Sequence, residues 1–365
     1  MFAGPVTMRE HIHRNTDADL QGHGSGGQMK ISSMFVAFLF LLSITGLSMG
    51  ATASVIWMTI TPGARPNGMG EAFTAMSDDA TASYWNPAGL AFSGVSGKQE
   101  LTLQHSNWLP QLADDLYYEF LGYSKYIDGW GGVGGNITFM SMGEQLETSE
   151  SGQELGEFYS YGIAMTGSFG TEVAPGVSVG LGLKFIYDHL YYQDSGKGTS
   201  FGVDLGALYR VPMEELGLEN VGKVNLGGSL SNLGPNMSYG GNTENNPLPR
   251  TLRMGLAYIP FDEQLMRLRI CADYSKLLVN VDDGLGEEFK ENKWGVGTEF
   301  WYYDLLALRA GYIHDTEGIS TIQGPTFGAG LQYAGFQLDM AFIPVEENLQ
   351  GAGKYNSKYS LTVRF

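Results

Sequence analysis

Apolar and polar side chains alternate along most of the chain beyond residue 97. In segment 177–188, Val, Leu, Phe and Tyr occupy one parity, whereas Ser, Gly, Lys and Asp occupy the other. The same period of two recurs in segments 199–210 and 335–343. Successive side chains of a strand point to opposite faces, so this period predicts β-strands rather than helices. The pattern therefore predicts an all-β fold.

Fourteen such segments can be delimited. They are 98–107, 116–126, 131–142, 157–170, 177–190, 199–210, 224–233, 250–259, 266–277, 291–302, 305–312, 325–333, 335–343 and 357–365. Tight turns are predicted at Tyr303-Asp304 and Ala334-Gly335. Long loops are predicted at 143–156, 234–249, 278–290 and 344–356. This asymmetry is typical of outer-membrane barrels and places both termini in the periplasm and the long loops outside the cell.

The polar face of these strands favours a barrel interior over the wet face of a soluble sandwich, because it combines many glycines with isolated charges. Charges inside a membrane protein need partners, so we expect them to pair with each other or with a plug. The charges are Lys184, Asp188, Asp204, Arg210, Arg253, Arg269, Asp273, Glu299, Asp339 and Arg364. We expect the inward glycines to make room for that plug. They are Gly180, Gly182, Gly202, Gly206, Gly295, Gly297, Gly328 and Gly330.

The segment 63–91 ahead of the strands is the expected plug, or hatch. It is rich in small residues, including Gly68 and Gly70, which allow backbones to pack closely. It ends in Trp-Asn-Pro-Ala-Gly, and a helix cannot continue past Pro87. We expect residues 54–96 to form the hatch and residues 97–365 the barrel.

Residues 29–53 read as an export signal. Segment 29–53 has a basic start, a short apolar run and the sequence Ala-Thr-Ala, which predicts cleavage after Ala53. A retained membrane anchor is the alternative, although the apolar run is short for a span. Residues 1–28 are expected to be a mis-assigned start or an extra extension.

Composition agrees with a membrane barrel. Only 16 % of the 365 residues are charged, and there are 52 glycines. The net charge of −18 argues against nucleic acid as a partner. The single cysteine, Cys271, cannot form an intramolecular disulfide. The last predicted strand ends on the terminal residue, Phe365. A terminal aromatic residue of this kind is typical of bacterial outer-membrane barrels.

No catalytic constellation, metal site or cofactor motif emerges, so we expect a protein that is not an enzyme. The histidines are scattered, and the acidic runs lack calcium-loop spacing. One loop does suggest binding. Trp108, Leu109 and Pro110 follow the first strand, and such residues are typical either of protein contacts or of membrane-interface anchors.

Several long stretches resemble one known family. They are GARPNGMGEAFTAMSDDATASYWNPAGLA in the hatch, HSNWLPQLADDLYYEFLGYSKY with GGNITFMSMGEQ, SNLGPNMSY with PLPRTLRMGLAY, WYYDLLALRAGYIHD, GPTFGAGLQY and YSLTVRF. These are similar to the PorV/PorQ branch of the FadL-like outer-membrane proteins, and most of all to PorV proteins. The resemblance implies a transmembrane 14-stranded antiparallel β-barrel with an N-terminal hatch inside it.

The resemblance also implies a role in the type IX secretion system of the bacterial outer membrane. Family members associate with a giant translocon barrel, receive secreted cargo through its C-terminal domain and pass it to a sortase-like attachment complex. Outer-membrane lipid is the remaining partner, and Trp108, Leu109 and Pro110 are the expected protein contacts. Two alternatives stay open. One is a FadL-like transporter of hydrophobic molecules gated by Asn86, Pro87 and Ala88 with Gly68 and Gly70, and the other is a structural barrel.

Overall fold

The computed structural model describes ten segments of the chain. They are residues 53–92, 99–108, 113–149, 151–191, 196–218, 221–240, 246–278, 292–315, 322–345 and 355–365. Residues 1–52, which hold the expected extension and nearly all of the expected signal, lie outside them. So do residues 279–291 and 346–354, which make up most of the predicted loops 278–290 and 344–356, and these expectations remain predictions. Within the described segments, no helix is long and apolar enough to cross a membrane.

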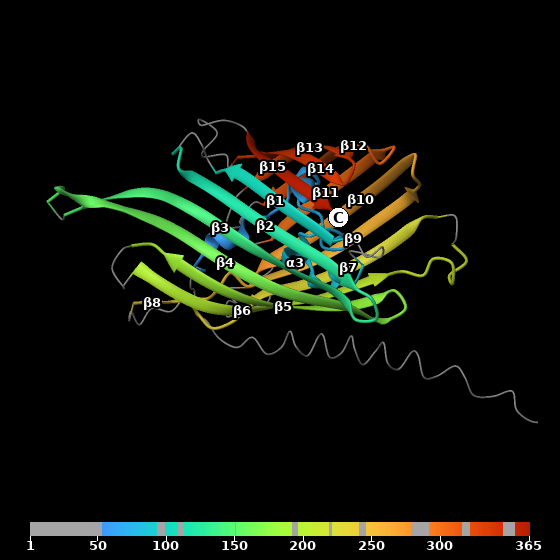
Figure 1. The fold of residues 1–365 in the computed structure, drawn as a ribbon, viewed down its shortest axis with the longest axis horizontal. Helices are drawn as coiled ribbons and strands as arrows, with labels where there is room; N and C mark the ends of the chain where they lie inside the picture. Colours follow the sequence, from blue (N-terminus) through green and yellow to red (C-terminus); the bar gives the residue numbers. More distant parts are fainter. Residues whose placement is uncertain are drawn as a thin grey trace, which may run out of the picture. The chain divides into compact units, whose positions relative to one another are not determined.

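Antiparallel strands form a closed ring in chain order (Figure 1). The long strands are β1 (Gln99–Asn107), β2 (Leu116–Ile127), β3 (Gly131–Thr148), β4 (Glu154–Ala174), β5 (Val177–His189), β6 (Lys197–Arg210), β7 (Lys223–Leu233), β9 (Thr251–Asp262), β10 (Met266–Leu277), β11 (Lys293–Tyr302), β12 (Leu306–Asp315), β13 (Gln323–Tyr333), β14 (Phe336–Pro344) and β15 (Tyr355–Arg364). The ring closes where β1 pairs with β15, from Glu100 opposite Arg364 to His105 opposite Tyr359.

These fourteen long strands confirm the predicted barrel in the part of the chain that the structure describes. The sheet also contains a fifteenth, two-residue strand, β8 (Ser238–Tyr239), which the periodicity did not predict. It pairs with Gly198 and Thr199 of β6, beyond the point at which β7 pairs with β6. One connection thus folds back onto the rim of the ring.

The connections confirm the predicted tight turns. Tyr303, Asp304, Ala334 and Gly335 all have positive φ, which two-residue hairpin turns of type I′ require. Both turns lie at one end of the ring, here called the short-turn end, together with the terminus at Phe365. The opposite end is the long-loop end. There the expected loop 143–156 is wrong for most of its length, because β3 and β4 continue through it as a paired ribbon.

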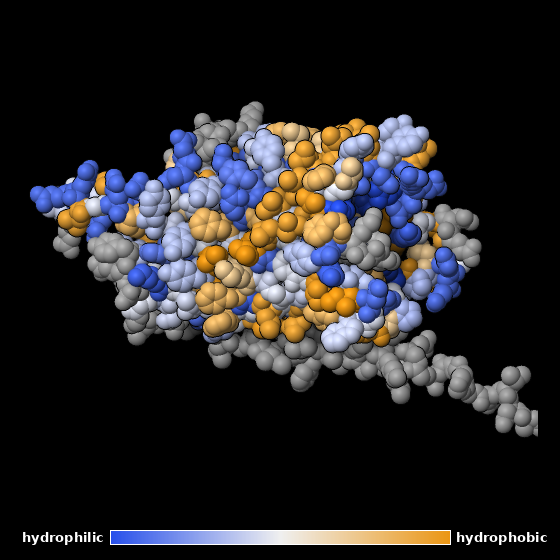
Figure 2. Space-filling model, viewed as in Figure 1, coloured by the Kyte–Doolittle hydropathy of each residue, from blue (hydrophilic) through white to orange (hydrophobic). Residues whose placement is uncertain are grey.

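The two faces of the wall separate by polarity as the alternation predicted. On β5, Leu181, Leu183 and Phe185 are exposed to the outside, whereas Lys184 and Asp188 are buried inside. Figure 2 shows apolar residues gathered across the middle of the ring. An outward apolar band is what a lipid-facing surface needs, because lipid offers no hydrogen bonds to polar groups.

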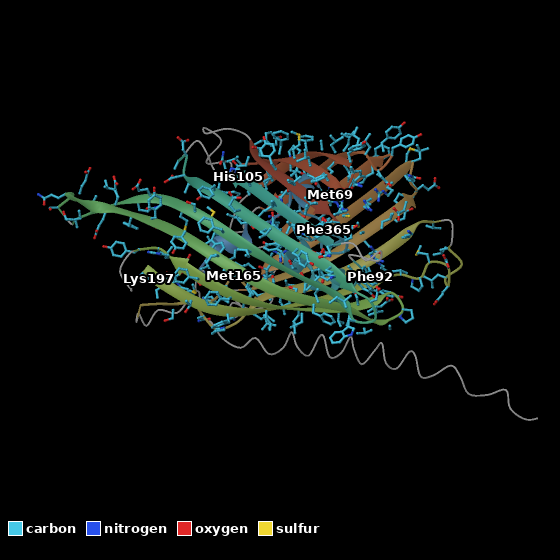
Figure 3. All side chains as sticks on the ribbon, in the orientation of Figure 1. Met69, Phe92, His105, Met165, Lys197 and Phe365 are labelled. Carbon is cyan, nitrogen blue, oxygen red and sulfur yellow. The ribbon has the colours of Figure 1, made fainter. Side chains whose placement is uncertain are left out.

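The hatch occupies the interior of the ring and is almost entirely buried. It contains four short helices: η2 (Ile56–Thr59), α2 (Ala64–Gly68), α3 (Ala82–Trp85) and η3 (Pro87–Ala91). The amide of Ser54 donates to the carbonyl of Pro247 at the long-loop end (2.9 Å), whereas the guanidinium of Arg210 stacks over Phe92 at the short-turn end. The hatch therefore runs through the ring from one end to the other; Figure 3 labels Met69 and Phe92 within it.

Candidate functional site

The Asn-Pro-Ala motif joins the hatch to the wall. Asn86 lies between α3 and η3, and its Oδ1 accepts from the amide of Ala88 in the first turn of η3 (3.1 Å). Its Nδ2 donates to the carbonyls of Thr74 (3.0 Å) and Ala207 on β6 (3.0 Å). One buried side chain thus fixes the turn and holds it against a strand. The structure does not test whether this motif opens, so its role as a gate remains a prediction.

Wall glycines allow this contact. A Cβ added at Gly206 would lie 2.2 Å from Oδ1 of Asn86, and one at Gly180 would lie 2.2 Å from the amide nitrogen of Ala88. Further glycines that meet the hatch in this way are Gly295, Gly297 and Gly328. The expectation differs at Gly182, Gly202 and Gly330, which instead face residues of the wall.

Gly68 and Gly70 hold the middle of the hatch against the opposite wall. The amide of Gly70 donates to Oγ1 of Thr326 (3.0 Å), and that hydroxyl donates to the carbonyl of Gly68 (3.2 Å). Gly70 has a φ of +64°, and a Cβ there would lie 2.4 Å from the carbonyl oxygen of Val296. Only glycine fits both the conformation and the approach.

Arg65 is the charged centre of the hatch. Its Nε and Nη2 bind the two carboxylate oxygens of Glu299 on β11 at 2.9 and 3.0 Å. Its Nη1 binds Asp78 (2.6 Å) and Asp79 (2.9 Å), both within the hatch. Burial disfavours the charge, but Asp78, Glu299 and Asp79 together hold the pKa of Arg65 well above its usual value. The hatch is therefore folded around a charge that the wall helps to neutralise.

The wall continues this network. Glu299 also accepts from Arg269 (2.7 Å) and Arg309 (2.7 Å), and Arg309 binds Asp339 (2.8 Å). The side chains of Glu299, Arg309 and Asp339 are at most 2 % exposed. Removing one member of such a network leaves an uncompensated buried charge, which costs about 3–5 kcal/mol. The network therefore anchors the hatch firmly.

A second anchor lies nearby. Nζ of Lys293 binds the carboxylate of Glu71 (2.5 Å), and Nζ of Lys358 donates to the carbonyl of Thr61 (2.5 Å) and to Oδ1 of Asn67 (3.0 Å). Burial raises the pKa of the Glu71 carboxyl, but Lys293 and Lys358 outweigh it, so that pKa lies below its usual value. The carboxylate form of Glu71 is thus stabilised by the wall.

An apolar compartment fills the long-loop end of the interior. The indole of Trp57 stacks against Gly162, where a Cβ would lie 2.3 Å from the ring. Its Nε1 donates to Oδ1 of Asp188 (3.1 Å), and the hydroxyl of Tyr239 donates to Oδ2 (2.6 Å). The cluster of buried residues comprises Val55, Trp57, Met58, Tyr118, Phe120, Met140, Ala164, Ile186, Met237 and Leu248. A barrel interior is normally polar, so this compartment stands out.

Of the three predicted partner-binding residues, the structure describes only Trp108. Trp108 is half-buried, packs against the apolar compartment and donates its amide to the carbonyl of Leu116 (2.8 Å). Leu109 and Pro110 lie outside the described residues. The structure therefore places the indole of Trp108 further inward than a freely exposed contact residue would lie, and the role of the three residues remains a prediction.

Predicted inward charges do find partners. Lys184 binds Asp204 (3.0 Å), and Asp273 accepts from the amides of Phe73 (3.0 Å) and Thr74 (2.8 Å). Sequence reasoning missed other members of the site, namely Trp57, Arg65, Glu71, Asp78, Asp79, Lys293, Arg309 and Lys358. Within the described segments, no group of three or more His, Cys, Asp or Glu residues is arranged to hold a metal ion.

A family model described as "Type IX secretion system protein PorV" matches residues 48–283. No curated protein matches the chain.

Several solved structures are similar to this chain. The toluene transporter TodX of Pseudomonas putida has a TM-score of 0.50 and 15 % identity, over 83 % of this chain and 96 % of its own. The toluene transporter TbuX of Ralstonia pickettii has a TM-score of 0.52 and 13 % identity, over 83 % and 97 %. A Pseudomonas aeruginosa FadL homologue has a TM-score of 0.44 and 14 % identity, over 84 % and 98 %. At these identities the likeness to TodX and TbuX shows the fold alone.

Proposed function

The chain belongs to the family of the type IX secretion system protein PorV, and from this premise we propose that it carries exported proteins at the bacterial outer membrane. In this proposal it receives cargo that bears a C-terminal signal domain from the giant translocon barrel. It then delivers that cargo to the sortase-like attachment complex. The long-loop end faces the outside of the cell, and the short-turn end with Phe365 faces the periplasm.

The observation that carries the proposal is the anchoring of the hatch. Arg65 and Glu71 pair with wall residues in the interior, and the Asn86 side chain bonds to β6. Opening a path through the ring would break buried ion pairs as well as hydrogen bonds, each break being costly. A barrel closed in this way is suited to work through its loops rather than through its lumen.

A second candidate is a FadL-like transporter of hydrophobic molecules, gated by Asn86, Pro87 and Ala88. The apolar compartment around Trp57 is the observation that favours it, since such a compartment suits an apolar solute. A transporter must move its hatch, whereas a carrier and a purely structural barrel need not. The mobility of the hatch therefore separates the transporter from the others.

The test combines partner capture with a locked hatch. The tagged protein is purified from native outer membranes in mild detergent, and its companions are identified by mass spectrometry. A very large barrel, or exported proteins that share a C-terminal domain, would support the carrier. A barrel without companions that contains bound lipid or fatty acid would overturn the carrier in favour of the transporter.

The lock uses two residues in contact across the interior. Nδ2 of Asn136 on β3 donates to Oγ of Ser83 in α3 (2.8 Å). Cysteines at both positions, in a Cys271→Ser background, would tie the hatch to the wall on oxidation. Cargo export by the oxidised protein should equal that of the two single-cysteine controls if the chain is a carrier. Loss of hydrophobic solute uptake on oxidation, restored by reductant, would instead identify a transporter.

A further inference from the structure

The hairpin of β3 and β4 projects beyond its neighbours at the long-loop end. β2 last pairs with β3 at Leu116 opposite Met142, and β5 last pairs with β4 at His189 opposite Tyr161. Beyond these points β3 and β4 pair only with each other, to Thr148 opposite Glu154. Figure 1 shows this ribbon, residues 143–149 and 151–160, reaching past the ends of the other strands. Its length is about 20 Å at the rise of a strand.

A row of aromatic rings marks where the ribbon leaves the membrane. Tyr117, Phe139 and Tyr161 lie on adjacent strands with ring centroids 6.0 and 5.9 Å apart, and Tyr187 follows at 6.1 Å. Girdles of this kind sit at the interface between lipid and water. Because the ribbon begins beyond Tyr161, its side chains project into water rather than into lipid.

One face of the ribbon already has a partner. Gln145 and Phe158 lie opposite each other, as do Glu147 and Gly156. The ring of Phe158 packs edge-on against Tyr191 at 4.9 Å, and the hydroxyl of Tyr191 donates to the carboxylate of Glu147. The connection after β5 thus supports this face, and it holds the ribbon in a defined orientation.

The other face is open and mixes acidic with apolar side chains. Glu144 lies opposite Tyr159, and Leu146 lies opposite Glu157. Leu146 is 50 % exposed and Tyr159 is 59 % exposed, while Leu155 near the tip is 60 % exposed. Neither Lys nor Arg occurs anywhere in residues 143–160. The carboxylates on this face therefore have no cation on the ribbon itself.

This arrangement is unfavourable for the ribbon when it stands alone. An isolated two-stranded ribbon is marginally stable in water, and like charges on one face repel each other. Exposed Leu and Tyr side chains between the charges gain free energy when a partner covers them. A partner that supplies cations and apolar contacts would remove both costs. An anionic lipid surface would add to the repulsion instead.

We propose that the open face of the ribbon, formed by Glu144, Leu146, Glu157 and Tyr159, is a docking site for a protein surface that carries Lys or Arg side chains between apolar ones. The site deepens the proposed carrier function, on which it rests for the identity of its partner. Association by such a surface is steered by charge and depends on ionic strength.

The experiment places a photo-cross-linking phenylalanine analogue at Leu146 in the full chain. The variant is produced in its native cells, so that it inserts into their outer membrane. Cross-linked peptides are mapped by mass spectrometry, and the yield is measured with and without Glu144→Lys and Glu157→Lys. We expect the cross-linked peptides to carry Lys or Arg beside apolar residues, and the double reversal to lower the yield at least tenfold. The matched control is Glu214→Lys with Glu215→Lys, two exposed acidic residues at the short-turn end, which should leave the yield unchanged.

Every outcome is decisive. Equal yields from the reversed and control variants, peptides without basic residues, or no cross-link would overturn the docking site. The yield of the wild-type protein is also measured with a chelator present. If the chelator lowers the yield and calcium restores it, the carboxylates form a cation site, and this result too would overturn the docking site. Secretion components that co-purify despite an unaffected yield would leave the carrier function standing while the docking site fails. A basic partner unrelated to secretion would leave the docking site standing while the carrier function fails. Heat-modifiable mobility of each variant verifies folding.

Discussion

The indole nitrogen of Trp57 lies 3.1 Å from Oδ1 of Asp188, and this bond joins the first helix of the hatch to the far end of β5. The second oxygen of Asp188 accepts from Tyr239 on the small strand β8. A single carboxylate therefore links the hatch, the wall and a folded-back connection. The early part of the hatch depends on it for its position.

We expect Trp57→Phe to weaken this link. It keeps an aromatic ring beside Gly162 but removes the donor to Asp188, which should cost about 1–3 kcal/mol. Unfolding in denaturant measures the loss. In a double-mutant cycle with Asp188→Ala, the two losses should fall short of adding, because each change removes the bond between Trp57 and Asp188. Strict additivity would show that the bond contributes nothing.

The effect of substituting a wall glycine on folding should depend on whether that glycine faces the hatch or the outside of the barrel. A Cβ at Gly297 would lie 2.1 Å from the carbonyl oxygen of Met69, so Gly297→Val should prevent stable folding around the hatch. Gly167 is the matched control, because a Cβ there meets nothing within 4 Å. Heat-modifiable mobility on a gel reports the folded barrel. A folded Gly297→Val protein with normal mobility would contradict the account of hatch packing.

Breaking the Arg65 network should be far more damaging than breaking a surface pair. Arg65→Met leaves Glu299, Asp78 and Asp79 without their shared partner, at a cost of about 3–5 kcal/mol. Arg65→Lys should recover only part of this, since an ammonium cannot bind both oxygens of Glu299 in parallel. The exposed pair Lys223–Asp262 gives the comparison, because Lys223→Met should cost at most about 1 kcal/mol. Free energies of unfolding decide the matter.

Acid should loosen the hatch. The folded-state pKa of Glu71 and that of Asp78 lie below their usual values. Burial raises both, but Lys293 and Lys358 together outweigh it at Glu71, and Arg65 and Arg269 together outweigh it at Asp78. Lowered values mean that both carboxylates stabilise the folded state above their unfolded pKa. This stability is lost as the pH falls through the folded pKa. Proteolysis of the hatch should therefore accelerate below about pH 4.

The matched control for that prediction is Glu71→Gln. The variant should be less stable at neutral pH, because Lys293 loses its partner, and its protease resistance should change less as the pH falls. Equal pH dependence in the variant and the parent would assign the acid sensitivity to other carboxylates.

Local pattern alone was sufficient to predict the wall. A barrel strand has one face in lipid and one in a polar interior, so alternation is continuous and its limits agree with those of the strands within a few residues, apart from β3 and β4. The turn at Tyr303-Asp304 was equally visible, since two adjacent strands leave little choice of connection. Residues 143–156 of the ribbon were predicted as a loop because acidic residues and glycine are depleted in ordinary strands.

The interior could not be read in the same way. Arg65 and Glu299 are 234 positions apart, and Lys358 and Thr61 are 297 apart, so no local pattern relates them. Trp57 lies at the start of the predicted hatch and showed no sign of its role, because its partner Asp188 is on a strand far along the chain. The inward charges predicted only that each needs a partner, because a buried charge without one is costly. They did not indicate which residue the partner is.

The path of the hatch through the ring has a consequence for assembly. Hatch residues precede every strand that the structure describes, yet they bind strands as late as β15, and β15 must pair with β1 to complete the wall. A ring that closed first would have to admit Trp57 and Arg65 past a finished rim. The order of synthesis offers a simpler course, in which the hatch arrives first and the strands gather around it. The hatch then acts as a template for the barrel, and the pairing of β15 with β1 closes an interior that is already filled.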